Sequence, residues 1–348
     1  MPNPLQTLVQ GAILALVIGW VLYIGRDVFV PVVFSILVVY VIMGLTRLLE
    51  AVPLVGPALP RAARQALAVL VIGLALFGMG YLFLAHQQDV VALAPQYQQA
   101  LLDAIQRGAV MLRIETEPTW ETLRQYALTQ VNIQRLAASM VASVSSIIVS
   151  VVVVVLYAGF LLVEQATFAK KLAGLSSDAA GVARSAGIVR DINARIGSYL
   201  ALKTLVSVLL GAICWAIMRV MGLEFAGFWA ILIAFLNFVP YIGSFLGVLF
   251  PVAMSIVQFG NPGEVFAMFA ALTVAQVAIG TFLDPYLMGN SLNLSPFVIL
   301  VSLTVWSRLW GIPGAFLAVP ITAIMAIMFS GFKGTRPIAV LLSRNGEL

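Results

Sequence analysis

The sequence contains very little charge for its length. Only 9% of its 348 residues are Asp, Glu, Lys or Arg, against roughly 25% in soluble domains. Hydrophobic residues make up 62% of the chain, and the mean hydropathy is +1.06. A water-soluble fold cannot bury so much apolar surface, whereas a bilayer solvates it and leaves the backbone hydrogen-bonded within helices. The composition predicts an all-α, polytopic transmembrane protein.

Side chains that bind metals or form disulfides are also scarce. The chain has a single cysteine, Cys214, and a single histidine, His86. One cysteine excludes an internal disulfide, and the two residues together are too few soft ligands for a zinc or iron–sulfur site. We therefore expect no metal and no cofactor. The excess of 19 basic over 14 acidic residues is typical of cytoplasmic loops rather than of a nucleic-acid partner.

Catalytic motifs are lacking as well. No Gly-x4-Gly-Lys-Ser/Thr run occurs, which excludes ATP hydrolysis through a phosphate loop. An intramembrane hydrolase needs a nucleophile with its base or a pair of carboxylates, and Asp284 has no partner carboxylate in the interior of a predicted span. We expect no enzyme. A gated channel remains an alternative, because helices broken by Gly and Pro also line pores, although no filter motif is present.

Long apolar runs predict the membrane helices. A helix needs roughly 20 apolar residues to cross the hydrocarbon core. Only Arg26 and Asp27 separate the first two runs, and one helix over both would be about 57 Å long, so we expect a tight helical hairpin there. Six runs qualify as spans: residues 7–25, 28–46, 66–85, 140–163, 197–219 and 264–283.

Two further apolar stretches, 225–258 and 296–330, are too long for one straight span. The first is interrupted at Pro240–Gly243 and the second at Gly311–Gly314. Proline removes a backbone donor and clashes with the preceding turn. Each stretch is predicted to form two half-helices, either as a re-entrant hairpin or as a kinked span, and the sequence leaves this choice open. The total is about eight membrane segments.

Positive charges predict the orientation. Basic residues follow the second, fourth and last spans, and such loops are usually cytoplasmic. We therefore expect cytoplasmic N- and C-termini. The predicted organisation is three N-terminal membrane helices in residues 1–85, an extracytoplasmic amphipathic helical segment in 86–139, a C-terminal membrane transport region in 140–332 and a cytoplasmic tail in 333–348.

The two broken stretches contain a weak internal repeat. Gly243–Pro251 resembles Gly314–Pro320, and each follows its Pro/Gly break. Pairing each stretch with the helix before it gives two units, 197–258 and 264–330, a pattern by which transporters build a substrate site near the midplane. The alternative explanation is that Gly and Pro are simply common in membrane helices.

A few polar residues within the apolar segments are candidates for a substrate or ion pathway. Asp284 precedes Pro285, which predicts a helix end there, and its carboxylate is the candidate proton or sodium carrier. Arg308 lies inside the last broken stretch; it either pairs with Asp284, binds substrate or snorkels to the headgroups. Asn237 precedes the first break and offers an amide to a polar solute or to helix packing.

Lys203, near the cytoplasmic end of its span, either snorkels or contacts substrate. With Tyr241 in the first break, it completes the candidate set. The pathway candidates are Asp284, Arg308, Asn237, Tyr241 and Lys203, and the expected hinge or broken-helix residues are Pro240, Gly243, Pro285, Gly289, Gly311, Pro313, Gly314 and Pro320.

Three ordered motifs in the C-terminal half resemble the autoinducer-2 exporter-like family. They are Phe235–Gly243, then Asp284–Gly289 with Leu294–Pro296, then Trp310–Pro320. The resemblance extends over about residues 10–332 and implies a multi-span permease of the bacterial inner membrane, with a large external loop after the third span. It also implies a homo-oligomer, pentameric in some relatives. Arg308 departs from the family pattern, in which a small or apolar residue is expected.

The resemblance also suggests substrates. Family members are described as exporters of the furanone-type quorum-sensing signal, and others as cation/proton antiporters. We therefore expect a secondary transporter of a small polar solute, with autoinducer-2 or a related signal as one candidate and protons or sodium as coupling ions. Alternating access would let the two broken stretches enclose the solute. A cation/proton antiporter and a gated channel are the alternatives.

Overall fold

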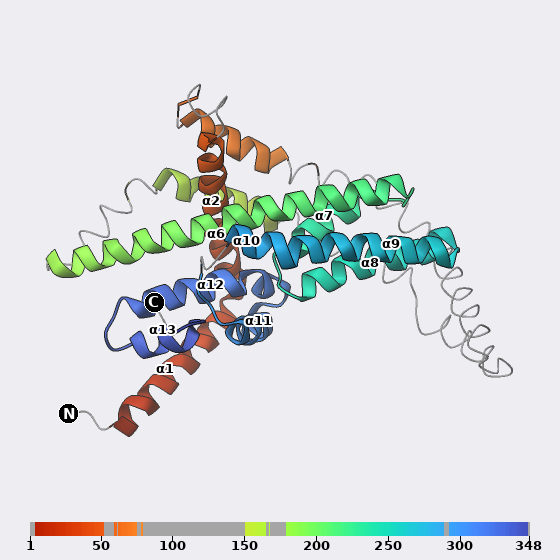
Figure 1. Ribbon diagram of the computed structural model, residues 1–348. Coiled ribbons are helices and arrows are strands. Elements are labelled where there is room, and N and C mark those ends of the chain that lie inside the picture. The colour runs from red at the N-terminus through yellow and green to blue at the C-terminus, as the bar shows by residue number, and fades with distance from the viewer. Residues whose placement is uncertain are drawn as a thin grey trace. The chain divides into compact units, whose positions relative to one another are not determined.

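The computed structural model describes residues 4–51, 59–60, 62–74, 78, 150–164, 167, 179–288 and 292–346. All the elements in these ranges are helices (Figure 1). Five of the described helices are long and apolar enough to cross a membrane: Arg26–Arg47, Gly181–Val220, Ile242–Phe259, Pro262–Leu287 and Ile312–Ser330. The predicted all-α, polytopic membrane fold is confirmed. The predicted external segment 86–139 lies outside the described residues.

The first two helices, α1 (Pro4–Ile24) and α2 (Arg26–Ala51), follow one another with a bend at Gly25 (Figure 1). Helical hydrogen bonds continue across the bend, from Gly25 N–H to Val21 C=O at 2.8 Å and from Phe29 N–H to Gly25 C=O at 2.9 Å. The predicted tight hairpin is therefore wrong. The physical reason is that antiparallel helices need a loop of about 2 to 5 residues, and only Gly25 separates these two.

The chain forms two compact units. Unit 1 comprises Met1–Ala68, Ser150–Leu202 and Asn290–Leu348, and unit 2 comprises Val69–Val149 and Lys203–Gly289. The long helix α6 (Ala179–Val220) contributes its first part to unit 1 and its second part to unit 2. Unit 1 also contains α1, α2, α11 (Pro296–Trp310), α12 (Ile312–Ser330) and α13 (Arg336–Leu342); unit 2 also contains α7 (Ala226–Leu236), α8 (Ile242–Phe259), α9 (Pro262–Val277), the π-helix η1 (Ala278–Leu283) and α10 (Asp284–Met288).

Unit 2 has an apolar core between α6, α7, α8 and α9. The α6 side chains in this core recur every four residues, so they lie on one face of the helix. Ser207 and Lys203, which are four residues apart and both buried, lie three residues before Leu210 and Val206 and therefore next to this face. Core residues include Val206, Leu210, Cys214 and Met218 from α6, Ala230 and Ile233 from α7, Met254 from α8, and Met268 and Leu272 from α9.

The first broken stretch folds back on itself as the hairpin α7–α8. Ile233 of α7 packs beside Gly247 of α8, although 14 residues separate them in sequence. The Gln258 side chain closes the open end, accepting from Glu224 N–H at 2.8 Å and donating to Gly222 C=O at 2.8 Å. Helix α7 has 11 residues and is about 16 Å long, too short to cross a membrane.

The second broken stretch forms the hairpin α11–α12. Trp306 Nε1 of α11 donates to Thr322 Oγ1 of α12 at 3.3 Å. The chain after α13 also returns to the start of α11, where Ser295 N–H donates to Leu342 C=O at 3.0 Å. Both predicted breaks are confirmed, and both stretches are hairpins rather than kinked spans.

Each hairpin has a glycine that lies close to the backbone of the facing helix. A Cβ added at Gly243 would overlap the carbonyl oxygen of Leu236, and one added at Gly314 would overlap that of Trp306. A side chain at either position would therefore push the second helix away from the first. The two resembling sequence segments thus make the same kind of contact in their own hairpins.

Candidate functional site

The most unusual feature of unit 2 is a buried ion pair. Lys203 Nζ of α6 lies 2.8 Å from Asp284 Oδ2, and the two side chains are only 9% and 19% exposed. Charged residues are seldom buried unless they are paired. Snorkelling, the alternative considered for Lys203, does not describe this structure, because the ammonium group points to Asp284 instead of to the surface.

The π-helix η1 determines where Asp284 lies. The Asp284 N–H bonds to the carbonyl of Ile279, five residues earlier, and Asp284 itself is helical with φ −54° and ψ −55°. The predicted helix end at Asp284 is therefore wrong. Helix α10 continues past Pro285, because a proline is tolerated in the first turn of a helix, where its missing N–H is not needed. Isolated π-helical turns are frequent at functional sites.

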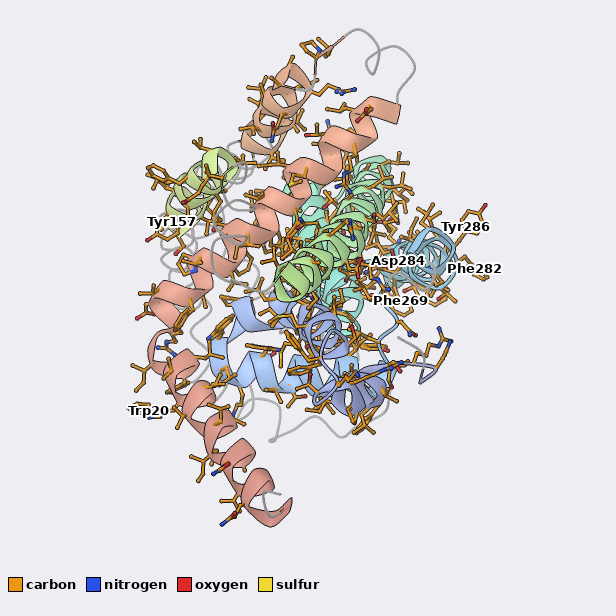
Figure 2. All side chains as sticks on the ribbon, turned by 90° about the vertical axis from the view of Figure 1, so that its left-hand side faces the viewer. Trp20, Tyr157, Phe269, Phe282, Asp284 and Tyr286 are labelled. Atoms are coloured by element: carbon orange, nitrogen blue, oxygen red, sulfur yellow. The ribbon has the colours of Figure 1, made fainter. Side chains whose placement is uncertain are left out.

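The side chains around the π-helical turn point to two different sides of the helix. Figure 2 shows Phe282 and Tyr286 on the outer side of the helix, where both are exposed, and Asp284 on the side toward α6. The aromatic rings thus face away from α6, while the carboxylate faces it. This arrangement agrees with the general rule that ionisable residues at membrane depth turn inward.

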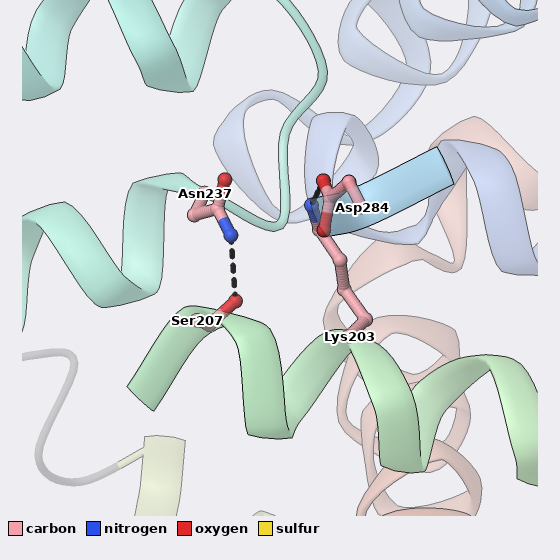
Figure 3. A network of polar contacts seen from close by, with 4 residues as sticks. All are labelled: Lys203, Ser207, Asn237 and Asp284. Carbon is pink, nitrogen blue, oxygen red and sulfur yellow. Dashed lines mark hydrogen bonds and ion pairs between the residues drawn. The ribbon is translucent and has the colours of Figure 1, made fainter. Parts of the chain in front are cut away.

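A second polar contact lies one helical turn along α6. The Asn237 Nδ2 atom donates to Ser207 Oγ at 3.0 Å, and both residues are buried. Asn237 is the C-cap of α7, and its own N–H bonds to the Ile233 carbonyl. Figure 3 shows that Lys203 and Ser207 project from the same face of α6 toward Asp284 and Asn237. One face of α6 therefore contacts both helix discontinuities of unit 2.

Two oxygen atoms of this site, one from Asp284 and one from Asn237, are candidates for ligand binding. Asp284 Oδ1 is buried and has no hydrogen-bond partner among the described residues. The amide nitrogen of Asn237 is used by Ser207, and Figure 3 shows its amide oxygen pointing away from α6. The site thus combines one ammonium group with carboxylate and amide oxygens. Such oxygens bind hard cations or accept hydrogen bonds from a polar solute.

Tyr241, another predicted pathway residue, occupies the tip of the α7–α8 hairpin. Its backbone has φ 62° and ψ −55°, and Ile242 N–H bonds to the carbonyl of Pro240 at 2.7 Å. This is a γ-turn of the rare type with positive φ, which is strained for a residue with a side chain. The Tyr241 side chain is exposed and is not part of the polar network around α6.

Arg308, also predicted to line the pathway, belongs to unit 1. It lies in the last turn of α11 and is exposed, where its positive charge complements the C-terminal end of the helix dipole. Its neighbours Trp306 and Trp310 have ring centroids 5.2 Å apart, and Trp310 Nε1 donates to the Leu22 carbonyl of α1 at 2.9 Å. The position of Arg308 is therefore explained within unit 1 by helix termination.

Several of the predicted hinge residues lie in or next to the two hairpin turns. Pro240 is in the turn of the first hairpin, Gly311 separates α11 from α12 with φ 66° and ψ −142°, and Pro313 is in the first turn of α12. Pro320 is buried within α12, and Gly289 lies outside the described residues. Their roles as hinges remain predictions.

Sequence reasoning missed Ser207 and the clip formed by Gln258. Ser207 follows Lys203 by four residues, so the spacing alone places both on one helix face. A serine in a membrane helix is too common to stand out, however, and its partner Asn237 is 30 residues away along the chain. No local pattern identifies such a pair.

The apolar helices and the buried ion pair are features of a multi-pass membrane transport protein. Comparison with known families agrees, because the model of the AI-2E family transporters matches residues 12–333. The chain belongs to the AI-2E transporter family.

Individual relatives carry names consistent with this family. The chain is 26% identical over 350 residues to the AI-2 transport protein TqsA of Escherichia coli K12, covering 99% of this chain and 98% of TqsA. It is 37% identical over 194 residues to a putative transport protein of Borreliella burgdorferi, covering 56% of this chain and 53% of the relative. A match to the putative transport protein YhhT of Escherichia coli K12 is 36% identical over 157 residues, 45% of this chain and 44% of YhhT. The last two matches thus span about half of the relatives' length.

Proposed function

We propose that this protein is a secondary transporter that moves a small polar solute across the bacterial cytoplasmic membrane, with Asp284 as the carrier of a coupling ion. The observation that carries the proposal is the buried Lys203–Asp284 pair. A charge at the centre of a membrane helix costs about 2.5 to 3.5 kcal/mol, and a buried ion pair contributes little net stability. A functional role explains why both charges are present.

Alternating access requires contacts that break and form again. In unit 2, α6 makes polar side-chain contacts with its neighbours through the Lys203–Asp284 pair and the Asn237–Ser207 hydrogen bond. An ion that neutralises Asp284 releases the first contact. The chain around Asp284 is then released from Lys203, whereas the end of α7 stays joined to α6 by the Asn237–Ser207 hydrogen bond, which contributes about 1 kcal/mol, and by the apolar core.

For the solute, the nearly full-length match to TqsA favours autoinducer-2 or a related small polar signal. The test is solute flux in proteoliposomes of the purified protein, under imposed proton or sodium gradients, with autoinducer-2 in the solute panel. We expect saturable flux that collapses with the gradient in the wild type and is lost in Asp284→Asn. Lys333→Gln, an exposed change in the C-terminal region, is the control and should retain flux.

Two results would contradict the proposal. Wild-type, gradient-driven flux in Asp284→Asn would remove Asp284 from the coupling step. A large ionic conductance that needs no gradient coupling would favour the gated channel instead.

A cation/proton antiporter is the second candidate. It is favoured by the unpaired Asp284 Oδ1 beside a lysine ammonium, since such a site serves an inorganic ion without an organic solute. Vesicles loaded with a pH-sensitive dye distinguish the two functions. Sodium-driven proton movement without any added solute would support the antiporter, and its absence would favour the solute transporter.

We further propose a cytoplasmic C-terminal tail, an extracytoplasmic segment 86–139 and a homo-oligomeric assembly. The basic residues Lys333, Arg336 and Arg344 support the tail assignment, because cytoplasmic loops are enriched in Lys and Arg. The expectation for the N-terminus depended on an α1–α2 hairpin, which the structure replaces with a bend, and is not carried forward.

A further inference from the structure

We infer that a monovalent metal cation, sodium above all, binds at Asp284, and that the Lys203 ammonium group competes with this cation for the Asp284 carboxylate. The inference rests on the proposed function and defines how the coupling ion enters its site. In the structure the Lys203 ammonium group occupies Asp284 Oδ2 at 2.8 Å. The other carboxylate oxygen, Oδ1, is buried and has no partner in the described part of the chain. Half of the carboxylate is therefore open to a cation.

The surrounding oxygens suit a metal ion better than a proton. A proton needs only one acceptor atom, whereas hard metal cations collect several carboxylate and carbonyl-type oxygens. Ser207 binds the Asn237 amide through its nitrogen, which leaves the amide oxygen directed away from α6 (Figure 3). Our inference assigns Asp284 Oδ1 and Asn237 Oδ1 as the protein ligands of the cation, because both residues contact the same face of α6.

Charge balance determines what happens when the cation arrives. The Lys203–Asp284 pair is neutral, and a bound cation adds a second positive charge close to the ammonium group. Like charges repel strongly where water does not screen them, so the ammonium group leaves Oδ2 as the cation binds. The flexible four-carbon side chain allows this movement.

Competition by Lys203 also explains how the transporter, with no ion bound, returns to its starting conformation. Without Lys203, the unoccupied site would leave the Asp284 carboxylate buried and uncompensated, which is costly inside a membrane. With Lys203, the empty site is neutral and the protein can change conformation without an ion. Lys203 is thus a positioning residue for the ion cycle and does not itself contact the solute.

Chemical acetylation of Lys203 tests the inference on the full-length wild-type protein in detergent. The protein is treated with acetic anhydride in sodium chloride or in choline chloride, at equal ionic strength and fixed pH, and the modified peptides are quantified by mass spectrometry. Sodium should increase the acetylation of Lys203, because the amine is released from Asp284, and should leave the exposed Lys333 unchanged. Equal acetylation of Lys203 in both salts would overturn the inference.

Sodium binding by Lys203→Met provides a second, independent measurement. Removing the competitor should tighten sodium binding, measured by titration calorimetry, by about tenfold if the wild-type site is open in about a tenth of molecules. Asp284→Asn should show no binding. Weaker binding by a folded Lys203→Met protein would show that Lys203 supports the site instead of competing for it, and would overturn the inference.

These measurements require no transport. Sodium-dependent acetylation together with normal coupled flux in Asp284→Asn would disprove the proposed function, although the cation site would exist. Coupled flux that depends on Asp284, without any effect of sodium on the acetylation of Lys203, would support the proposed function. It would overturn the inference that Lys203 competes with the cation.

Discussion

Lys203 and Asp284 depend on each other for their burial, and this dependence can be measured. Removing one member of a buried ion pair leaves the other charge uncompensated and costs about 3 to 5 kcal/mol, whereas replacing both is often neutral. We therefore expect Lys203→Met and Asp284→Asn each to lower the melting temperature in sodium-free buffer, and the double variant to recover most of the loss. Thermal unfolding of detergent-purified protein provides the double-mutant cycle. Additive losses would show that the two residues act separately.

Tyr241 provides a test of backbone strain. A side chain in this positive-φ conformation, φ 62° and ψ −55°, costs about 1 to 3 kcal/mol, and the exposed ring loses little burial when it is removed. Tyr241→Gly should therefore be more stable than Tyr241→Val in thermal unfolding. The matched control is Phe245, which is exposed in the regular part of α8. There the order should be reversed, because glycine weakens a regular helix. The same order at both positions would contradict the strained turn.

The two hairpins depend on glycines that no other residue can replace. Gly243→Ala and Gly314→Ala each place a methyl group on a backbone carbonyl of the facing helix, and overpacking of this kind costs about 1 to 3 kcal/mol or more. Both variants should unfold at lower temperature. Gly227→Ala in α7 is the control, because its added Cβ meets nothing within 4 Å, and it should be stabilising by about 0.5 to 1 kcal/mol. Unchanged stability of Gly243→Ala and Gly314→Ala would show that the hairpins open easily.

The helix breaks could be predicted from the sequence, because Pro and Gly act on their own backbone and need no distant partner. The same local reasoning failed at Pro285. A proline usually ends a helix one residue earlier, but the π-helical turn before Asp284 allows the chain to continue. The sequence also could not distinguish a hairpin from a kinked span. That choice depends on contacts between distant residues, such as those of Gln258 with Gly222 and Glu224.

For the molecule as a whole, composition was sufficient to predict an all-α membrane protein, because lipid solvates the apolar side chains that a water-soluble fold would have to bury. The candidate site was predicted only in part. Lys203 and Asp284 were both selected as rare charges in apolar segments, but their pairing joins residues separated by 81 positions. A single sequence contains no information on such a contact. The bend at Gly25 was missed because hydropathy counts the length of spans and does not report whether a loop is long enough to reverse the chain.

The orientation in the membrane leads to a final prediction. In unit 2, the Gln258 clip holds the turn before α7 beside the end of α8, so both ends of the α7–α8 hairpin lie on one side of the membrane. If the basic residues that precede the α6 span are cytoplasmic, as such residues usually are, that side is outside the cell. In a Cys214→Ala background, Glu224→Cys and Glu264→Cys should react with a membrane-impermeant maleimide on intact cells. Arg344→Cys, in the C-terminal tail, should react only after the cells are opened.

Each possible labelling pattern has a distinct meaning. Cys214 is fully buried, so its replacement should remove background without exposing a new surface. Labelling of Glu224→Cys and Glu264→Cys from opposite sides would contradict the hairpin, because one of α7 and α8 would then be the sole crossing between them. Labelling of Arg344→Cys on intact cells would show that the orientation is the opposite of the one expected. The expected pattern requires that the 11 residues of α7, about 16 Å of helix, enter the membrane without crossing it. Asn237, at the end of α7, would then lie within the membrane, where it contacts Ser207 of α6.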